Sequence, residues 1–399
     1  MIHCMKRLVL ALLLSTSTAA FAQTKVSKKA MKALVKESLA FSARQYKGMM
    51  TAVPDSLFPR STNKDGSLMT AKYNWWTAGF YPGSCWYLFE ATGDPAFRAE
   101  AEKRQQNLLA NQYRTNTHDL GFLMYCSFGN DLRLTRDTAA RRILLTSSAS
   151  LIKRYKPTIG AIRSWDHAGW KCPVIIDNMM NLEMLMWAAK ESGDQNFATI
   201  AVNHANTTIK NHFRDDYSSY HVIDYDTATG QVLAKKTHQG HSDASAWSRG
   251  QAWGLYGYTM MYRETKDNAY LDQARHIADY MLNHPNMPAD LIPYYDYDAP
   301  EIPNAIRDAS AGAVMASALL ELSRYVDKTA SKRYWNAGAD ALVSLSGEAY
   351  RAKEGGNNHF ILMHSTGSMP GNSEIDVPLS YADYYYLEAL LRYKKGDGR

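Results

Sequence analysis

The feature that most constrains the fold of this chain is a short phrase that recurs along it. Residues 89–97, 189–197 and 262–270 each pass from an apolar helical pattern, through a turn with an Asp, into a second helical pattern. Looser copies occupy 134–137 and 325–328. Gly93 and Gly193 can adopt the left-handed conformation that ends many helices, and Asp94, Asp194 and Asp267 can cap the helix that follows. The phrase therefore predicts a series of helical hairpins.

The two helices of each hairpin differ in polarity. The helix before each stop is apolar on most sides, which predicts burial, whereas the helix after it is amphipathic. About six such hairpins would occupy the chain. We therefore expect an all-α protein, an (α/α)6 barrel with apolar helices inside and amphipathic helices outside. An open solenoid of the same hairpins is the alternative. Residues 53–73 predict a loop, and residues 220–225, with a turn at Thr229-Gly230, predict a short ribbon.

The first 22 residues predict a secretory signal peptide. Lys6 and Arg7 precede the apolar run 8–14, and residues 20–22 form a small-x-small cleavage signal. The apolar run is too short to span a bilayer. We expect residues 1–22 to be removed, and residues 23–399 to form a single domain that is exported without a membrane anchor. In a bacterium, that location is the periplasm.

The charge and cysteine content of the chain limit the kinds of ligand and partner that we expect. The formal net charge of +6 is spread along the chain, with no block of Lys and Arg of the kind that indicates nucleic acid. A mild positive excess suits a small anionic substrate. Cys85, Cys126 and Cys172 lie in apolar contexts, which favours three buried thiols over a disulfide, and no metal-binding spacing occurs. We expect no nucleic acid, metal or cofactor, and a monomer or weak oligomer.

Residues 172–187 read as a helix that is apolar on nearly every side. Asp177, Asn178 and Asn181 place polar groups on one face near its start. A buried carboxylate is costly unless it is paired or lines a wet cavity. The structural interpretation is a capping or hydrogen-bonded Asp in the core. The functional interpretation is a carboxylic acid whose pKa is raised by apolar surroundings.

Other candidate residues have comparable alternatives. Asp119 precedes the apolar run 120–126 and is either a helix cap, a functional carboxylate, or both. Trp165 either stacks on a sugar or plugs the ring of helices. Residues 237–253 form the densest polar and aromatic stretch. There, Arg249 can bind a carboxylate through two hydrogen bonds, or form an ion pair with an Asp such as Asp243.

Six segments, taken in order, resemble one known family. They are 74–83 (NWWTAGFYPG), 118–122 (HDLGF), 162–165 (IRSW), 177–181 (DNMMN), 248–254 (SRGQAWG) and 381–390 (YADYYYLEAL). Together they resemble the unsaturated glucuronyl hydrolases, family eighty-eight of the glycoside hydrolases. The resemblance covers nearly the whole mature chain. It implies an (α/α)6 barrel, no metal, and action on polysaccharide lyase products that carry a 4,5-unsaturated uronic acid at the non-reducing end.

The resemblance also implies roles for individual residues. Asp177 matches the main acid/base of the family, and Asp119 matches its second essential Asp. Seven further positions match its substrate cleft: Trp76, His118, Trp165, His221, Gln239, Arg249 and Trp253. Ser368 lies in a stretch, 364–371, where some members carry a Ser/Lys set that contacts substrate sulfate. This chain has no matching Lys there, so the preferred sulfation pattern stays open.

Two other functions remain as alternatives. An unsaturated rhamnogalacturonyl hydrolase shares this fold and reaction but acts on pectin fragments. A non-catalytic periplasmic glycan-binding protein would account for the aromatic residues and the helical repeats, but not for two carboxylates at the ends of apolar helices. The sequence does not distinguish chondroitin, hyaluronan and heparin fragments as substrates.

Overall fold

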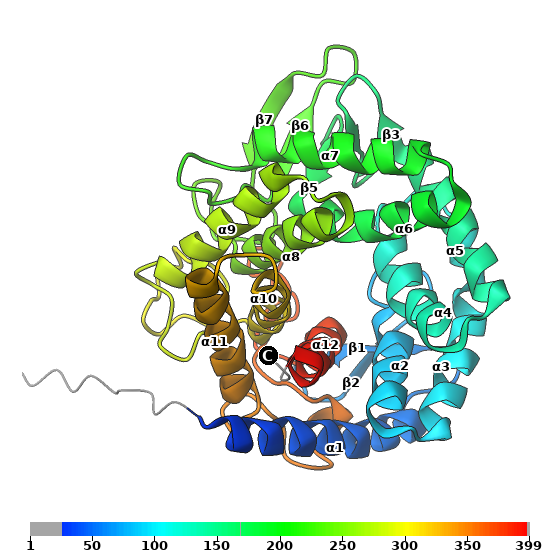
Figure 1. Ribbon diagram of the computed structural model, residues 1–399, viewed down its shortest axis with the longest axis vertical. Helices are drawn as coiled ribbons and strands as arrows, with labels where there is room; N and C mark the ends of the chain where they lie inside the picture. The colour runs from blue at the N-terminus through cyan, green and yellow to red at the C-terminus, as the bar shows by residue number, and fades with distance from the viewer. Residues whose placement is uncertain (1–25, 168, 397–399) are drawn as a thin grey trace, which may run out of the picture.

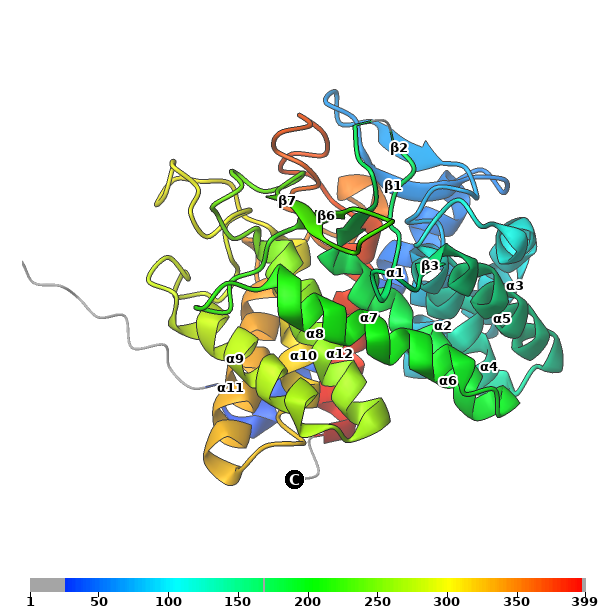
Figure 2. The same cartoon turned by 90° about the horizontal axis from the view of Figure 1, so that it is seen from above.

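The computed structural model describes residues 26–167 and 169–396, and it consists mostly of helices. The predicted signal peptide, residues 1–22, lies outside the described residues. Figure 1 shows two concentric rings of helices, and Figure 2 shows the strands and long loops gathered at one end of these rings. None of the described helices is both long and apolar enough to cross a bilayer.

Six helical units form the inner ring. They are α2 (Phe80–Thr92), the π-helical segment η2 (Gly121–Gly129) continued by α4 (Asn130–Thr135), α6 (Leu182–Ser192), α8 (Ser248–Thr265), α10 (Ala309–Leu322) and α12 (Ser380–Gly396). Each unit contacts the next in this order, and α12 contacts α2, so the ring closes. This closure does not fit the open solenoid that the repeats also allowed.

Six helices form the outer ring. They are α1 (Lys28–Ala52), α3 (Pro95–Leu108), α5 (Thr138–Leu151), α7 (Asn196–His212), α9 (Asn268–Asn283) and α11 (Lys328–Leu345). Each outer helix contacts two neighbouring inner units, as α9 does with α8 and α10. Outer helices bury one face only, whereas every residue of α10 is buried. The predicted division into apolar and amphipathic helices is confirmed.

The connections between the rings follow the recurrent phrase. Gly93 and Gly193 adopt left-handed conformations directly after α2 and α6, and Asp94 and Asp267 accept hydrogen bonds from backbone N–H groups at the starts of α3 and α9. In the third copy, Lys266 takes the left-handed position at φ 61°. The sequence phrase thus marks real helix ends, including one where no glycine is present.

The strands form three small antiparallel sheets at the end of the rings where the inner helices begin. They are β1 (Phe58–Thr62) with β2 (Leu68–Ala71), β3 (Tyr155–Lys156) with β4 (Ala161–Ile162), and β5 (Pro173–Ile175), β6 (Val222–Tyr225) and β7 (Val232–Lys236). The predicted ribbon near 220–225 is confirmed. The loop predicted over 53–73 instead contains the β1–β2 hairpin, because its polar turn at 63–67 masks the short strands on either side.

Short 3-10 segments complete the chain. They are η1 (Leu109–Tyr113), η3 (Ile152–Arg154), η4 (Ile176–Asn181) and η5 (Asn357–His359). The helix predicted over 172–187 is therefore divided into a strand, a 3-10 turn and an α-helix. This division matters for the site, because Asp177 lies in η4, at the entry to the ring.

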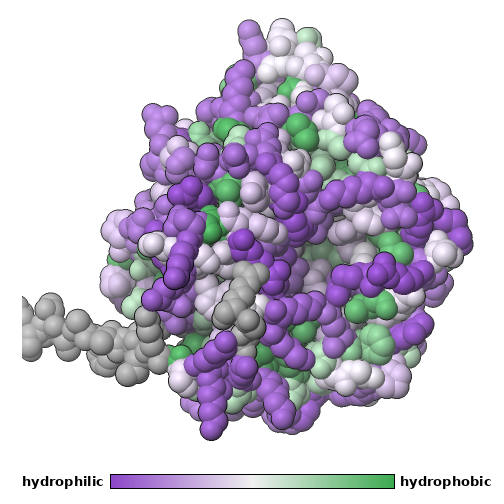
Figure 3. All heavy atoms as spheres, in the orientation of Figure 1, coloured by the Kyte–Doolittle hydropathy of each residue, from purple (hydrophilic) through white to green (hydrophobic). Residues whose placement is uncertain are grey.

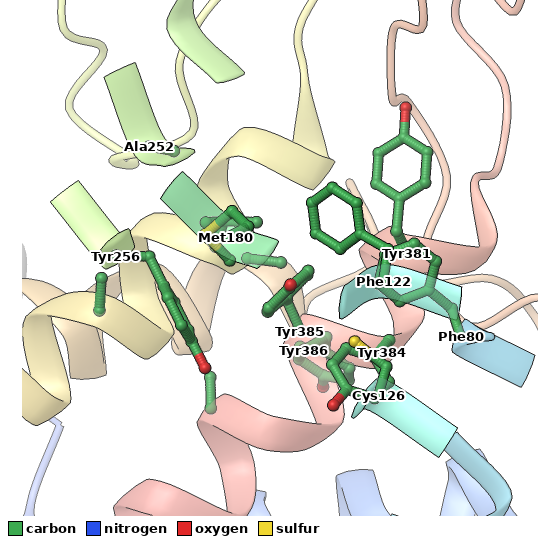
Figure 4. Close-up of a cluster of buried hydrophobic side chains, with 14 of the residues drawn as sticks. Phe80, Phe122, Cys126, Met180, Ala252, Tyr256, Tyr381, Tyr384, Tyr385 and Tyr386 are labelled. Atoms are coloured by element: carbon green, nitrogen blue, oxygen red, sulfur yellow. The ribbon is translucent and has the colours of Figure 1, made fainter. Parts of the chain in front are cut away.

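Aromatic side chains fill the middle of the inner ring. Figure 4 shows Phe80 from α2, Phe122 from η2 and the tyrosines of α12 converging there. Phe122 and Trp253 have ring centroids 5.4 Å apart, and Trp253 and Tyr385 5.4 Å. The three cysteines, Cys85, Cys126 and Cys172, are buried free thiols, as predicted.

A cavity lined by aromatic and charged side chains opens at the opposite end of the ring, where the inner helices finish. Its volume is about 580 Å³, and Figure 3 shows this largely hydrophilic face. Most of the charged side chains around it form ion pairs, as in Arg392 with Glu321 (2.8 Å) and Arg133 with Glu90 (2.6 Å). Mutually neutralised charges indicate a structural network.

Glycines allow close packing inside the ring, which gives a matched test on α8. A Cβ at Gly257 would lie 2.5 Å from Cβ of Met179, whereas a Cβ at Gly254 would meet its nearest neighbour at an ordinary 3.4 Å. We expect Gly257→Ala to lower the free energy of unfolding by about 1–3 kcal/mol through overpacking. Gly254→Ala should leave it unchanged or raise it by up to about 1 kcal/mol, because Ala favours the helix. Urea denaturation measures both, and equal effects would contradict this account of the packing.

Candidate active site

The β5–β6–β7 sheet delivers two of the predicted site residues to the entry of the ring. Strand β5 runs directly into η4, which carries Asp177, and β6 lies beside β5. The backbone N–H of Ile176 donates to the carbonyl of His221 at 3.0 Å. This pairing fixes His221 beside Asp177, although the two residues are far apart in the sequence.

Asp177 is almost completely buried, at 8% exposure. Within the described part of the chain, its Oδ1 atom has no hydrogen-bond partner, and Nε2 of His221 is 3.8 Å away. Burial raises the pKa of Asp177 to about 7 against the opposing guanidinium of Arg249, and the negative charge of Asp119 adds to the rise. A buried carboxyl with an unsatisfied oxygen is what the functional interpretation of this Asp requires.

Asp119 lies immediately before the inner segment that starts at Leu120. Its carboxyl accepts a hydrogen bond from the Thr117 hydroxyl at 3.3 Å, and its Oδ1 is 3.1 Å from Nε2 of His118. Burial raises its pKa to about 7, opposed by Thr117 and by the charges of Arg114 and Arg154. The structural interpretation as a helix cap does not hold, because this carboxyl points to side chains instead of the first N–H groups of the helix.

Polar contacts hold the two carboxyl-bearing segments against each other. The side-chain oxygen of Asn181 accepts from the backbone N–H of Phe122 at 3.0 Å. A Cβ on Gly121 would lie only 2.6 Å from Cα of Asn181, so only glycine permits this approach. Since Asn181 follows Asp177 by four residues and Gly121 follows Asp119 by two, the contact brings both carboxyls to one region. They are therefore expected to titrate as a coupled pair.

Asn178 and Ser164 form the support behind Asp177. The Ser164 hydroxyl donates to the Asn178 side-chain oxygen at 2.9 Å and accepts from the N–H of Ile175 at 2.9 Å. The Asn178 amide also donates to the carbonyl of Ile162 at 2.7 Å. Asn178 is therefore structural. Asp177, in contrast, has one carboxyl oxygen without a hydrogen bond from the described residues.

Arg249 is held in place by buried contacts close to Asp177. Its guanidinium is buried at 1% exposure, pairs with Asp308 at 2.9 Å and donates to the carbonyls of Thr366 and Gly367. The amide of Gln239 also donates to Gly367, at 2.9 Å. These bonds occupy Nη1 and one hydrogen of Nη2, whereas Nε has no hydrogen-bond partner among the described residues. Arg249 and Gln239 anchor the loop that continues into Ser368, and the grip of Arg249 on a substrate carboxylate stays a prediction.

The ion-pair partner of Arg249 is Asp308, which the sequence did not suggest. The sequence suggested an ion pair with an Asp such as Asp243, but Asp243 accepts from Lys236 at 2.8 Å. Asp308 was not singled out in the sequence, because the residues around it predict only a helix cap. It does cap α10, and its second oxygen holds Arg249.

The predicted aromatic residues divide into two groups. Trp253, which the resemblance matches to a substrate-cleft position, is fully buried in the core. Trp76 is half-buried and packs on Phe122 and Tyr381 with centroids 5.6 and 5.0 Å away. Trp165 is half-exposed and so does not plug the ring.

Trp165 belongs to an aromatic surface beside Asp177. Its ring lies 4.9 Å from His238 and 5.9 Å from His221, and His221 lies 4.4 Å from Trp247. Such a surface can contact the apolar face of a sugar ring. His238 and Trp247 were not singled out in the sequence, since neither stands in a pattern that distinguishes it from its neighbours. Ser368 is half-exposed, and its hydroxyl accepts from the N–H of Gly371 at 3.2 Å.

The arrangement therefore offers two coupled carboxyls with raised pKa values, two buried histidines and an aromatic wall. Such a set can give and take protons near pH 7. In the ranges 26–167 and 169–396, no three His, Cys, Asp or Glu side chains converge in a way that would hold a metal ion.

Comparisons with known proteins agree on one group of relatives. The unsaturated glucuronyl hydrolase of Formosa agariphila is 44% identical over 374 residues, 93% of each chain. The unsaturated chondroitin disaccharide hydrolase of Streptococcus pyogenes serotype M1 is 31% identical over 85% of this chain and 86% of its own length. No protein-family model matches the chain.

Solved structures give the same result. The crystal structure of an unsaturated glucuronyl hydrolase specific for heparin superposes with a TM-score of 0.89 and 49% identity, covering 91% of this chain and 98% of the other. The unsaturated glucuronyl hydrolase of Bacillus sp. GL1 superposes with a TM-score of 0.84 and 30% identity, covering 92% and 97%.

The raised pKa of Asp177 predicts a stability effect that does not depend on activity. A carboxyl with a folded-state pKa of about 7 favours folding below its unfolded value, near 4, and that contribution is lost as the pH rises through 7. We therefore expect Asp177→Asn, which cannot ionise, to be more stable than the native protein at pH 8 by a few kcal/mol. The gain should disappear at pH 4. Thermal melts at both values test this, with Asp243→Asn as an exposed control.

Proposed function

This chain belongs to the unsaturated glucuronyl hydrolase family, and from that premise we propose that Asp177 and Asp119 form its catalytic pair. The protein is a glycoside hydrolase that acts on oligosaccharides carrying an unsaturated uronic acid. It removes the 4,5-unsaturated uronate from the non-reducing end of glycosaminoglycan lyase products. The observation that carries the proposed pair is that the buried Asp177 and the largely buried Asp119 lie on adjoining segments, each with a pKa of about 7.

The substrate determines what the pair has to do. Its C4=C5 double bond is conjugated to the ring oxygen, so it is a vinyl ether. A proton added at C4 forms a C–H bond with the π electrons and leaves a positive centre at C5, shared with the ring oxygen. Water then bonds to C5 and loses a proton, and the resulting hemiketal opens and releases the neighbouring sugar. One molecule of water is consumed, and the protons balance.

We assign the proton transfers to Asp177 and the support of the positive centre to Asp119. The raised pKa of Asp177 allows it to hold a proton near neutral pH and to give it up to carbon. In this proposal Trp165 and Trp76, which are both partly exposed, contact the sugar rings, and the loop held by Arg249 and Gln239 carries Ser368 to the following sugar. Because the reaction is a hydration, the carboxylate-spacing rule for direct displacement at the anomeric carbon does not apply to it.

We further propose the finer features that the sequence predicts. The closed double ring is an (α/α)6 barrel, supported by the inner-ring contacts that run from α2 round to α12. Residues 23–399 form one catalytic domain that acts as a monomer or weak oligomer. The chain is exported to the periplasm after removal of residues 1–22, which the charged and apolar pattern of that segment supports.

Replacing Asp177 should abolish turnover without unfolding the protein. We expect Asp177→Asn to lower kcat by about 100- to 10,000-fold, since a group that transfers protons contributes on that scale. The decay of the ultraviolet absorbance of the substrate double bond measures the rate. Asp243→Asn, on the nearby surface, should keep its activity. Near-normal turnover by Asp177→Asn would remove this residue from the mechanism.

Asp119→Asn should also lower kcat strongly, because its carboxyl supports the transition state. A change confined to KM would instead assign Asp119 to substrate binding. The same absorbance assay separates the two outcomes when it is run over a range of substrate concentrations.

A panel of unsaturated disaccharides tests the substrate class. We expect heparin-derived disaccharides to be turned over faster than chondroitin-derived ones, because the heparin-specific relative is 49% identical whereas the chondroitin disaccharide hydrolase of S. pyogenes is 31% identical. Sulfated and unsulfated members of each type belong in the panel. Preferential turnover of pectin-derived disaccharides would favour an unsaturated rhamnogalacturonyl hydrolase. Binding without turnover would favour a glycan-binding protein.

A further inference from the structure

The β1–β2 hairpin at the entry to the ring contains an arginine in a special backbone position. The strands pair on both sides of Arg60, but the register shifts between Pro59 and Ser61, so Arg60 is the extra residue of a β-bulge. A bulge redirects the side chain of its extra residue, and bulges are over-represented beside active sites. The direction of the Arg60 side chain is therefore set by a local feature of the hairpin that a regular strand would not have.

This side chain lies on an exposed tryptophan. Cζ of Arg60 is 4.1 Å from the ring centroid of Trp75. Trp75 is 37% exposed, although Trp side chains are well buried on average. A planar guanidinium stacks on an indole face by a cation–π interaction, which orders both groups without removing them from solvent. The two residues thus form a rigid, positively charged aromatic surface, called here the Arg60–Trp75 pair.

Most of the hydrogen-bond donors of Arg60 are unused. Its Nε donates to Oε1 of Glu374 at 2.7 Å. An Arg side chain has five N–H donors, and four of them belong to Nη1 and Nη2. Among the residues that the structure describes, these two nitrogens have no hydrogen-bond partner. Because the Arg60 side chain is 21% exposed, a fork of donors is left for a ligand from solvent.

Glu374 connects the Arg60–Trp75 pair to the loop that carries Ser368. The backbone N–H of Gly367 donates to the carbonyl of Glu374 at 2.6 Å, directly before Ser368 in the chain. The Ser61 hydroxyl donates to the carbonyl of Pro378 at 2.8 Å, which ties β1 to the same loop a second time. Figure 2 shows the hairpin beside this loop, at the end of the rings where the site lies.

The segment around Trp75 also borders the carboxyl pair. Arg114 donates to the carbonyl of Asn74 at 2.9 Å, and the charge of the same guanidinium acts on Asp119. Trp76, the next residue, packs on Phe122 of the inner segment that follows Asp119. The Arg60–Trp75 pair is therefore joined to the site on two sides, through the Ser368 loop and through the segment before α2.

We propose that the Arg60–Trp75 pair is an anion-binding subsite for the part of the substrate that the reaction releases. This inference rests on the proposed function, in which the unsaturated uronate meets the carboxyl pair and the following sugar meets the Ser368 loop. The Nη1 and Nη2 fork of Arg60 matches an anionic group with two or more oxygens. Two such groups occur in this substrate class: a sulfate on the following sugar, and the carboxylate of a further uronate in a longer oligosaccharide.

Binding to the Asp177→Asn protein tests the subsite without turnover. Three unsaturated ligands are titrated by calorimetry: an unsulfated disaccharide, the same disaccharide with a sulfate on its second sugar, and an unsulfated hyaluronan tetrasaccharide. We expect at least one anionic ligand to bind more tightly than the unsulfated disaccharide. Adding Arg60→Gln should lower that preference roughly 10- to 100-fold, the scale of hydrogen bonds to a charged group. The sulfated ligand and the tetrasaccharide distinguish sulfate from carboxylate.

The same preference with and without Arg60→Gln, or no preference at all, would overturn the inference. Either result leaves the proposed function standing, because that function is tested separately by turnover of the unsulfated disaccharide. The preference should also weaken as salt is added, since salt screens an exposed charge.

Two further variants separate anion recognition from support of the loop. Glu374→Ala removes the ion pair but keeps the Arg60 cation, so the preference should persist or increase. If Arg60 only holds the loop, Glu374→Ala will abolish the preference as Arg60→Gln does, which contradicts the inference. Arg333 also pairs with an Asp (Asp279, 2.7 Å) and contacts an aromatic ring, but it lies in the outer helix α11. Arg333→Ala should therefore leave every ratio unchanged, and melting curves establish that all variants are folded.

Discussion

Each inner helix of this protein is enclosed by other helices over most of its surface, and that constraint governs where polar chemistry can occur. An inner helix contacts two inner neighbours and the outer helices behind them, so most of its side chains are buried. A carboxyl placed there would be costly to bury. Functional groups are consequently confined to the two ends of the ring. The carboxyl pair lies where inner segments begin, and the paired charges of the cavity lie where they end.

The carboxyl pair depends on contacts that are themselves not catalytic. Asn181 and Gly121 hold the two inner segments together, and the β5–β6 pairing brings His221 to Asp177. The buried Arg249–Asp308 pair anchors the loop across the mouth of the site. These contacts leave Asp177 with an oxygen that nothing in the described chain satisfies, a cost that the rest of the fold offsets. Substrate is then the natural partner of that oxygen.

The sequence predicted the features that depend on neighbouring residues, and it did not predict those that depend on contacts between distant residues. The Gly-Asp phrase predicted helix ends because the left-handed conformation and the cap are formed within a few residues. Asp177 and Asp119 stood out because a carboxyl in an apolar stretch is unusual whatever surrounds it. The contact of Arg249 with Asp308 and the complete burial of Trp253 were not predicted, because both depend on residues that are distant in the sequence.

The sequence alone determined the helical repeat, the polarity of each helix and the two acids, because each of these depends on residues only a few positions apart. Only the tertiary structure decided that the hairpins close into a ring, that η2 and η4 meet, and which hydrogen-bond partners each histidine has. Those outcomes depend on contacts between residues such as Phe122 and Asn181, separated by 59 positions. The ionisation of the pair is set by such contacts, because a pKa responds to the neighbours in space.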